Sequence, residues 1–125
     1  MIKGIGNDLT EIARVADAVQ KEAFRNHCYT SEEIAFCKDR AVLYADNFAA
    51  KEAVAKALGT GFSGFGPREI EVLRDGRGRP FVRLFGGAKE RMEELGITNI
   101  HVSISNTAEL SFATAVAETV ESQRP

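Results

Sequence analysis

One stretch of the sequence has the strongest helical character, and it limits the folds open to this chain of 125 residues. Residues 41–58 are rich in alanine and contain no glycine or proline, so they predict one long helix. Gly59 follows at once, and glycine is typical of the position just after a helix. A helix of this length has to bury an apolar side, and in a short chain the remaining segments must form the layer that covers it.

The segments around the long helix predict strands and shorter helices. The apolar run 2–6 indicates a buried strand that is followed by Asp8, and Thr10 then opens a helical pattern that runs to Gln20. Thr30 or Ser31 can cap another helix. We also expect a loop at 59–67, strands at 69–73, 81–84, 100–105 and 110–117, a hairpin turn at 75–78, a helix from 86 or 87 to about 96, and a frayed end at 122–125. This mixed order, with hairpins in place of regular βαβ units, predicts an α+β fold in a single domain, residues 1–125.

Charge and composition exclude several classes of protein. The formal net charge is −2, so the chain is not a polycation that coats nucleic acid, and we expect no nucleic-acid partner. No run approaches the roughly 20 apolar residues that a membrane span requires, and the N-terminus lacks a long apolar signal region. A cytoplasmic location with no membrane partner is therefore expected. Cys28 and Cys37 form no CxxC pair and are expected to be reduced thiols.

Two acidic residues, Asp8 and Glu52, are the candidate chemical groups. Glu52 and Lys56 are four residues apart and share one face of the long helix. Taken alone, such a pair is more often a surface ion pair worth a few tenths of a kcal/mol. Residues 59–64 also fit GxGxxG, but they follow a helix instead of a strand, so they do not indicate a dinucleotide site. Their glycines more plausibly let the backbone approach a ligand or turn tightly.

Four segments together resemble one known family. Residues 48–61, FAAKEAVAKALGTG, closely resemble the signature of the 4′-phosphopantetheinyl transferases. Residues 4–12, GIGNDLTEI, residues 78–80, GRP, and residues 101–107, HVSISNT, resemble segments of the short, single-domain branch of that family, the holo-[acyl-carrier-protein] synthases. The ordered set spans nearly the whole chain. The resemblance implies an antiparallel-rich sheet packed on the long helix, and homotrimers in which each active site lies between two subunits.

The resemblance also implies a reaction. Members of this family move 4′-phosphopantetheine from coenzyme A to a serine of apo acyl carrier protein and release adenosine 3′,5′-bisphosphate. Asp8, Glu52 and Lys56 are then catalytic, with Asp8 and Glu52 as Mg²⁺ ligands. These residue types suit the chemistry, because Mg²⁺ accepts one or two carboxylates together with substrate phosphates, and a lysine can reach a phosphate oxygen. The sequence leaves open whether Glu52 or a metal-bound water takes the serine proton, and whether Mg²⁺ or Mn²⁺ is preferred.

Further contacts with coenzyme A and the carrier are implied in the same way. Among the charged residues between 68 and 91, Arg79 is the preferred partner for the adenosine 3′-phosphate, and an ordinary solvated surface is the alternative. Arg14 is implied to contact the acidic carrier, and Arg25 extends this basic patch unless both are ordinary surface arginines. The implied coenzyme contacts are Lys56, Gly59, Gly61, Arg79, Pro80, Asn106 and Thr107.

Two positions depart from the family pattern. Asn47 and Asn106 stand where the family usually has a basic residue and a histidine that look like coenzyme contacts. A lost charged contact weakens binding by about 1.5–3 kcal/mol when nothing compensates for it. The departures favour an alternative function, a non-catalytic module that binds coenzyme A or a carrier protein, whereas the retained acidic pair favours an enzyme. An unrelated trimeric structural protein is a further alternative. The preferred carrier and the tolerance for acyl-coenzyme A cannot be read from the sequence.

Overall fold

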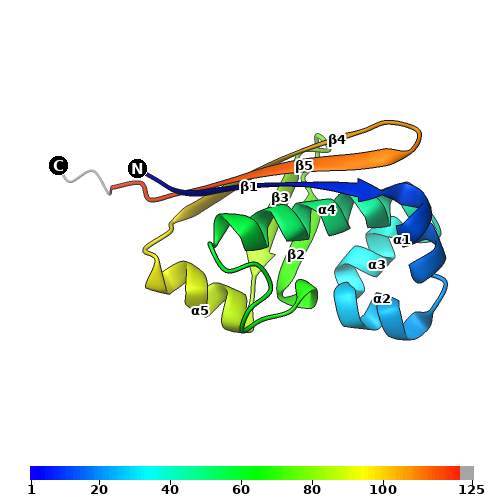
Figure 1. Ribbon diagram of the computed structural model, residues 1–125, viewed down its shortest axis with the longest axis horizontal. Helices are drawn as coiled ribbons and strands as arrows, with labels where there is room; N and C mark the ends of the chain where they lie inside the picture. Colours follow the sequence, from blue (N-terminus) through cyan, green and yellow to red (C-terminus); the bar gives the residue numbers. More distant parts are fainter. Residues whose placement is uncertain (122–125) are drawn as a thin grey trace.

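The computed structural model describes residues 1–121, in which the long helix lies against one face of a three-stranded sheet (Figure 1). The expected fraying of residues 122–125 lies outside the described residues. The sheet is antiparallel, and its strand order is β1-β5-β4. These four elements are β1 Ile2–Glu11, α4 Ala41–Ala57, β4 Asn99–Asn106 and β5 Leu110–Glu118.

The remaining elements flank α4 at both ends. Three short helices pack at its N-terminal end, and α5 lies towards its C-terminal end (Figure 1). An antiparallel hairpin, β2 with β3, packs beside the β4 edge of the sheet. These elements are α1 Ile12–Ala18, α2 Glu22–Cys28, α3 Ser31–Cys37, the short 3₁₀ helix Pro67–Glu69, β2 Ile70–Arg74, β3 Pro80–Leu84 and α5 Gly86–Glu94. The α+β prediction is confirmed. None of the helices in residues 1–121 combines the length and apolarity of a membrane span.

Local sequence signals explain several of these boundaries. Thr30 caps α3 in a reciprocal arrangement: its hydroxyl accepts the Glu33 backbone N–H, and the Glu33 carboxylate accepts the Thr30 N–H. The predicted long helix is confirmed, with Leu58 as its C-cap. Gly59 follows with φ of +82°, a conformation that glycine adopts without steric cost.

The prediction for the N-terminal strand is wrong in two respects. β1 does not end at Gly6 but continues to Glu11, and the helix begins at Ile12 instead of Thr10. The strand is also not buried on both faces, since Ile5 is 68% exposed. The reason is tertiary: β1 pairs with β5 along its length, from Ile2 opposite Glu118 to Glu11 opposite Leu110, and this ladder overrides the local helical pattern. The sequence analysis also missed α2.

Gly4 and Gly6 allow the helix to approach β1 closely. Strand alternation turns both residues towards α4. A Cβ at Gly4 would overlap the carbonyl oxygen of Ala57, and a Cβ at Gly6 would overlap that of Ala53. Elsewhere along the contact between α4 and the sheet, small alanine side chains also allow a short distance between the two layers. They are Ala49, Ala50, Ala53, Ala57, Ala113, Ala115 and Ala117. Backbone contact between β1 and α4 therefore fixes the relative position of the two elements.

A methyl group at position 6 tests this contact. We expect Gly6→Ala to lower the free energy of unfolding by about 1–3 kcal/mol or more, because the new Cβ meets helix backbone that cannot rotate away. Gly76→Ala in the hairpin turn is the matched control, since no atom lies within 4 Å of a Cβ there, and its effect should stay within about 0.5 kcal/mol. Urea denaturation midpoints compare the two variants. Equal midpoints would show that the stability of the fold does not depend on the close approach of α4 to Gly6.

Candidate active site

A cleft of about 390 Å³ opens where β1, α1 and α4 meet. Asp8 from β1 and Glu52 from α4 both line it. An apolar wall and several further polar residues complete the lining, with Thr10, Glu11, Arg14, Val15, Phe24 and Phe48 among them. The cleft therefore brings together two acidic residues that are far apart in the sequence.

Asp8 is held on β1 with its two carboxylate oxygens in different surroundings. It lies on the same strand face as Gly6, so its side chain points to the α4 side of the sheet. The Thr10 hydroxyl donates a hydrogen bond to Asp8 Oδ2 at 2.6 Å. Asp8 Oδ1 lies 3.6 Å from Lys56 Nζ. The sequence analysis placed Asp8 after a strand, whereas it lies within one.

Glu52 and Lys56 lie one turn apart on α4, as their spacing predicted. Lys56 Nζ also donates to the carbonyl oxygen of Asn7 at 2.9 Å, which ties the lysine to β1. The Glu52 carboxylate has no hydrogen bond or ion pair with any residue of the described part of the chain. Burial raises the pKa of the Glu52 carboxyl, and the nearby Asp8 carboxylate raises it further. Two carboxylates that face one cleft favour a cation between them.

The donor set fits Mg²⁺ only if a substrate completes it. In residues 1–121 no three His, Cys, Asp or Glu side chains gather in a way that could hold a metal. Asp8 and Glu52 supply two carboxylates, which is the number that Mg²⁺ commonly takes from a protein when waters and substrate phosphates occupy its other positions. A structural metal with a full set of protein ligands does not fit this cleft.

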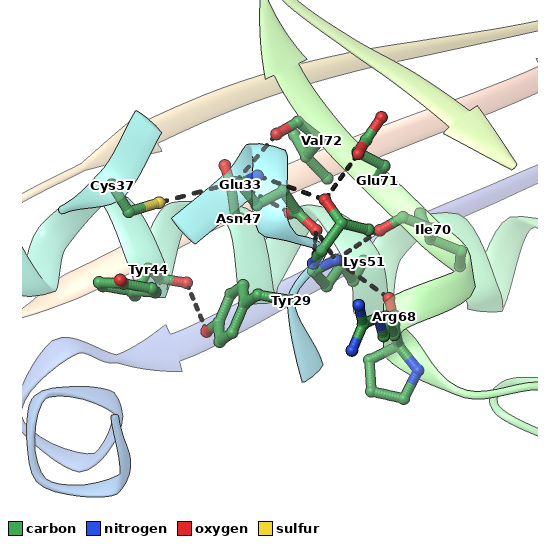
Figure 2. Close-up of polar contacts among 12 residues, drawn as sticks. Tyr29, Glu33, Cys37, Tyr44, Asn47, Lys51, Arg68, Ile70, Glu71 and Val72 are labelled. Atoms are coloured by element: carbon green, nitrogen blue, oxygen red, sulfur yellow. Dashed lines mark hydrogen bonds and ion pairs between the residues drawn. The ribbon is translucent and has the colours of Figure 1, made fainter. Parts of the chain in front are cut away.

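Lys51, the neighbour of Glu52 in the sequence, points towards Glu33 of α3 and Ile70 of β2 and is fully buried (Figure 2). Its Nζ donates to Glu33 Oε1 at 2.6 Å and to the carbonyl oxygens of Pro67 and Ile70. Burial lowers the pKa of Lys51, against the raising effect of the Glu33 carboxylate, and burial raises the pKa of Glu33. The contact joins α3 and the start of β2 to α4. The sequence analysis gave Lys51 no role.

Asn47 belongs to the same buried network. Its Nδ2 donates to Glu33 Oε2 and to the Val72 carbonyl oxygen, each at 3.0 Å, and its Oδ1 has no partner within residues 1–121 (Figure 2). The side chain is fully buried. Because Asn47 is buried in this network, a side chain at position 47 could reach coenzyme A only if the network opened. The asparagine that stands here in place of the family's basic residue therefore does not mark a lost contact on the surface of this structure.

None of the seven implied coenzyme contacts is among the residues that line the cleft, and four of them lie on another part of the chain. Arg79 and Pro80 lie at the end of the β2–β3 turn, where the Arg79 N–H donates to the Asp75 carboxylate. Asn106 donates to both carboxylate oxygens of the buried Asp46, at 3.1 and 3.0 Å. The Thr107 hydroxyl accepts two backbone N–H groups of the β4–β5 turn. These residues lie on the β4 side of the sheet, and β1 forms the opposite edge. One chain therefore keeps them apart from Asp8.

The other implied contacts fall into two places. Arg14 is exposed and lines the cleft, whereas Arg25 donates to the Val19 carbonyl oxygen and borders a separate hollow. Gly59 and Gly61 follow the C-terminal end of α4 with positive φ angles of 82° and 60°. No atom lies within 4 Å of a Cβ built at Gly61, so the loop leaves open space there.

Comparison with known proteins identifies the family. The sequence profile of the 4′-phosphopantetheinyl transferase superfamily matches residues 4–115, which is most of the chain. The chain belongs to this superfamily. The predicted membership in this transferase family is therefore confirmed, and the residues that carried the prediction, 4–12 and 48–61, fall inside the matched region.

Relatives within the transferase superfamily cover nearly the whole chain. The holo-[acyl-carrier-protein] synthase of Lachnoclostridium phytofermentans is 45% identical over 120 residues, which is 96% of this chain and 98% of the relative. The crystal structure of the Neisseria meningitidis holo-[acyl-carrier-protein] synthase matches with a TM-score of 0.86 and 32% identity over 95% of this chain and 100% of that one. The Helicobacter pylori enzyme, solved in complex with coenzyme A, matches with a TM-score of 0.83 and 32% identity, and the match covers 91% of this chain and 99% of that one.

Proposed function

We propose that this chain transfers 4′-phosphopantetheine from coenzyme A to a serine of an apo acyl carrier protein, in an Mg²⁺-dependent reaction that releases adenosine 3′,5′-bisphosphate. The observation that carries the proposal is that Asp8 and Glu52 line one cleft, with Lys56 3.6 Å from Asp8, in a chain from this transferase superfamily. The names of the relatives and the coenzyme A bound to the Helicobacter pylori structure support the two substrates.

Asp8, Glu52 and Lys56 each have a part in this reaction. Asp8 and Glu52 would hold Mg²⁺, which supplies positive charge against the pyrophosphate as its bridging P–O bond breaks. Lys56 already points towards the acidic pair, and its ammonium can move from Asn7 to a phosphate oxygen. The carrier serine oxygen forms the new bond to the phosphorus that bears pantetheine, and its proton goes to a base. Either Glu52 or a water bound to the metal would accept this proton.

The entrance of the cleft suits an acidic partner. Arg14 is exposed at the lining, and an apolar wall that includes Phe24 and Phe48 lies beside it. An exposed basic residue at the entrance suits the acidic carrier that the family resemblance implies. Arg25 contributes less to this surface than its sequence position suggests, because its guanidinium is already bonded to Val19.

We further propose that three copies of the chain assemble and share active sites. The face of the sheet turned away from α4 carries exposed apolar side chains, with Ile5 68%, Leu9 63% and Phe112 40% exposed. A monomer would leave this patch in water. A neighbour packed on the sheet could also supply the Arg79 and Asn106 region that one chain holds away from Asp8. Sedimentation equilibrium tests the assembly, and a purely monomeric protein at active concentrations would exclude it.

Intact-mass spectrometry of an apo carrier protein tests the reaction itself. The carrier is incubated with this protein, coenzyme A and Mg²⁺, and the expected result is a mass gain of one phosphopantetheine that EDTA prevents and added Mg²⁺ restores. A gain that survives EDTA would keep the transfer and exclude the metal. No gain with several carriers, while coenzyme A still raises the melting temperature, would favour a binding module.

A further inference from the structure

Thr10 has a contact in the cleft that the proposed roles of Asp8, Glu52 and Lys56 do not use. Its hydroxyl donates to Asp8 Oδ2 at 2.6 Å, a short hydrogen bond of the charge-assisted kind. Both side chains are half-buried and lie on the same face of β1, two residues apart. Thr10 therefore acts on the carboxylate and not on the helix that follows it, since that helix begins at Ile12 with Glu11 as its N-cap.

This bond distinguishes the two oxygens of Asp8. Oδ2 is occupied by Thr10, whereas Oδ1 lies towards Lys56 on α4. The bond restrains rotation of the carboxyl group about its last side-chain torsion, which is otherwise broad. The backbone supports the arrangement, because Asp8 and Thr10 pair with Ala113 and Ser111 of β5 in a part of the ladder that has no register shift.

We propose that Thr10 is a positioning residue, which turns Asp8 Oδ1 towards the cation and phosphates of the metal–coenzyme complex. The inference rests on the proposed function and adds to it the residue that orients one of the two acidic ligands. When a residue that hydrogen-bonds to a metal-ligating carboxylate is removed, metal affinity or activity typically falls by about 10–100-fold. A change of that size is measurable without disturbing either carboxylate.

Two variants separate the hydroxyl from the rest of the side chain. Thr10→Val keeps the branched shape that suits a strand and removes the donor, whereas Thr10→Ser keeps the donor. The readout is binding of Mn²⁺ in the presence of coenzyme A, followed by the electron paramagnetic resonance signal of free Mn²⁺. We expect Thr10→Val to weaken Mn²⁺ binding about 10–100-fold and Thr10→Ser to stay close to the unchanged protein. Melting temperatures should be equal in all three proteins.

The transfer reaction gives a second readout. For Thr10→Val, a higher Mg²⁺ concentration should restore the rate, and the KM for the carrier should not change. Unaltered Mn²⁺ binding by Thr10→Val would overturn the inference, as would equal losses in Thr10→Val and Thr10→Ser. If the unchanged protein neither binds Mn²⁺ with coenzyme A nor transfers phosphopantetheine, the proposed function itself fails. If the unchanged protein transfers phosphopantetheine and Thr10→Val binds Mn²⁺ normally, the proposed function stands and only the role of Thr10 is overturned.

Discussion

Replacing Glu52 with glutamine is expected to lower the rate of phosphopantetheine transfer about 10³-fold, which corresponds to about 4 kcal/mol in the barrier. Glutamine keeps the shape of the side chain but removes the negative charge that would hold the cation, and charge neutralisation by a metal is worth several kcal/mol in such transfers. Initial rates from the intact-mass assay, at saturating coenzyme A and Mg²⁺, measure the effect.

The same variant should not lose stability. Burial and the Asp8 carboxylate raise the pKa of Glu52 in the folded chain, so its ionised form is disfavoured there relative to the unfolded chain. Above the folded pKa the charge therefore costs stability, and Glu52→Gln should unfold at an equal or higher urea concentration in metal-free buffer at neutral pH. Glu90→Gln, on an exposed position of α5, is the control for the charge change and should transfer at the normal rate. An active Glu52→Gln would contradict the assignment of the metal pair.

Replacing Lys51 with methionine is expected to lower the free energy of unfolding by about 3–5 kcal/mol, a large part of the stability of a small domain. The change leaves the Glu33 carboxylate buried without its countercharge and removes the donor from the Pro67 and Ile70 carbonyl oxygens. Methionine has a similar length and fits an apolar site, so the loss reflects the missing charge and not a cavity. Urea denaturation followed by circular dichroism provides the measurement.

Lys56→Met is the matched control on the same helix. The Lys56 side chain is 51% exposed, so its loss should change stability by no more than about 0.5 kcal/mol. The two lysines then give opposite results: the Lys51 variant is destabilised, whereas the Lys56 variant is stable but transfers poorly. Similar stabilities for the two variants would show that the Lys51–Glu33 contact does not hold α3 and β2 in place.

Local patterns in the sequence predicted those elements whose cause is local. The long helix follows from its alanine content and the glycine behind it, and α3 follows from the capping pair of Thr30 and Glu33. The β2–β3 turn follows from the glycines around residue 77. The structure brings Asp8 and Glu52 to one cleft, but their role as a metal pair stays a prediction, which depended on resemblance to a family and not on spacing alone.

Features that depend on distant parts of the chain were not predicted. Gly4 and Gly6 look like the end of a strand in the sequence, but their role becomes clear only when α4 lies against them. Thr10 was interpreted as the start of a helix. It lies two residues after Asp8, however, and residues two apart share one face of a strand. The burial of Lys51 depends on Glu33 in another helix, and no periodicity within residues 41–58 indicates that partner.

The pairing of β1 with β5 also bears on how the protein matures. Asp8 is synthesised well before β5, the strand that holds β1 in the sheet. During synthesis the nascent chain therefore carries both signature motifs without a formed acidic pair, since contacts between distant segments must wait for the later one. The proposed active site would then form only after β5 has been synthesised.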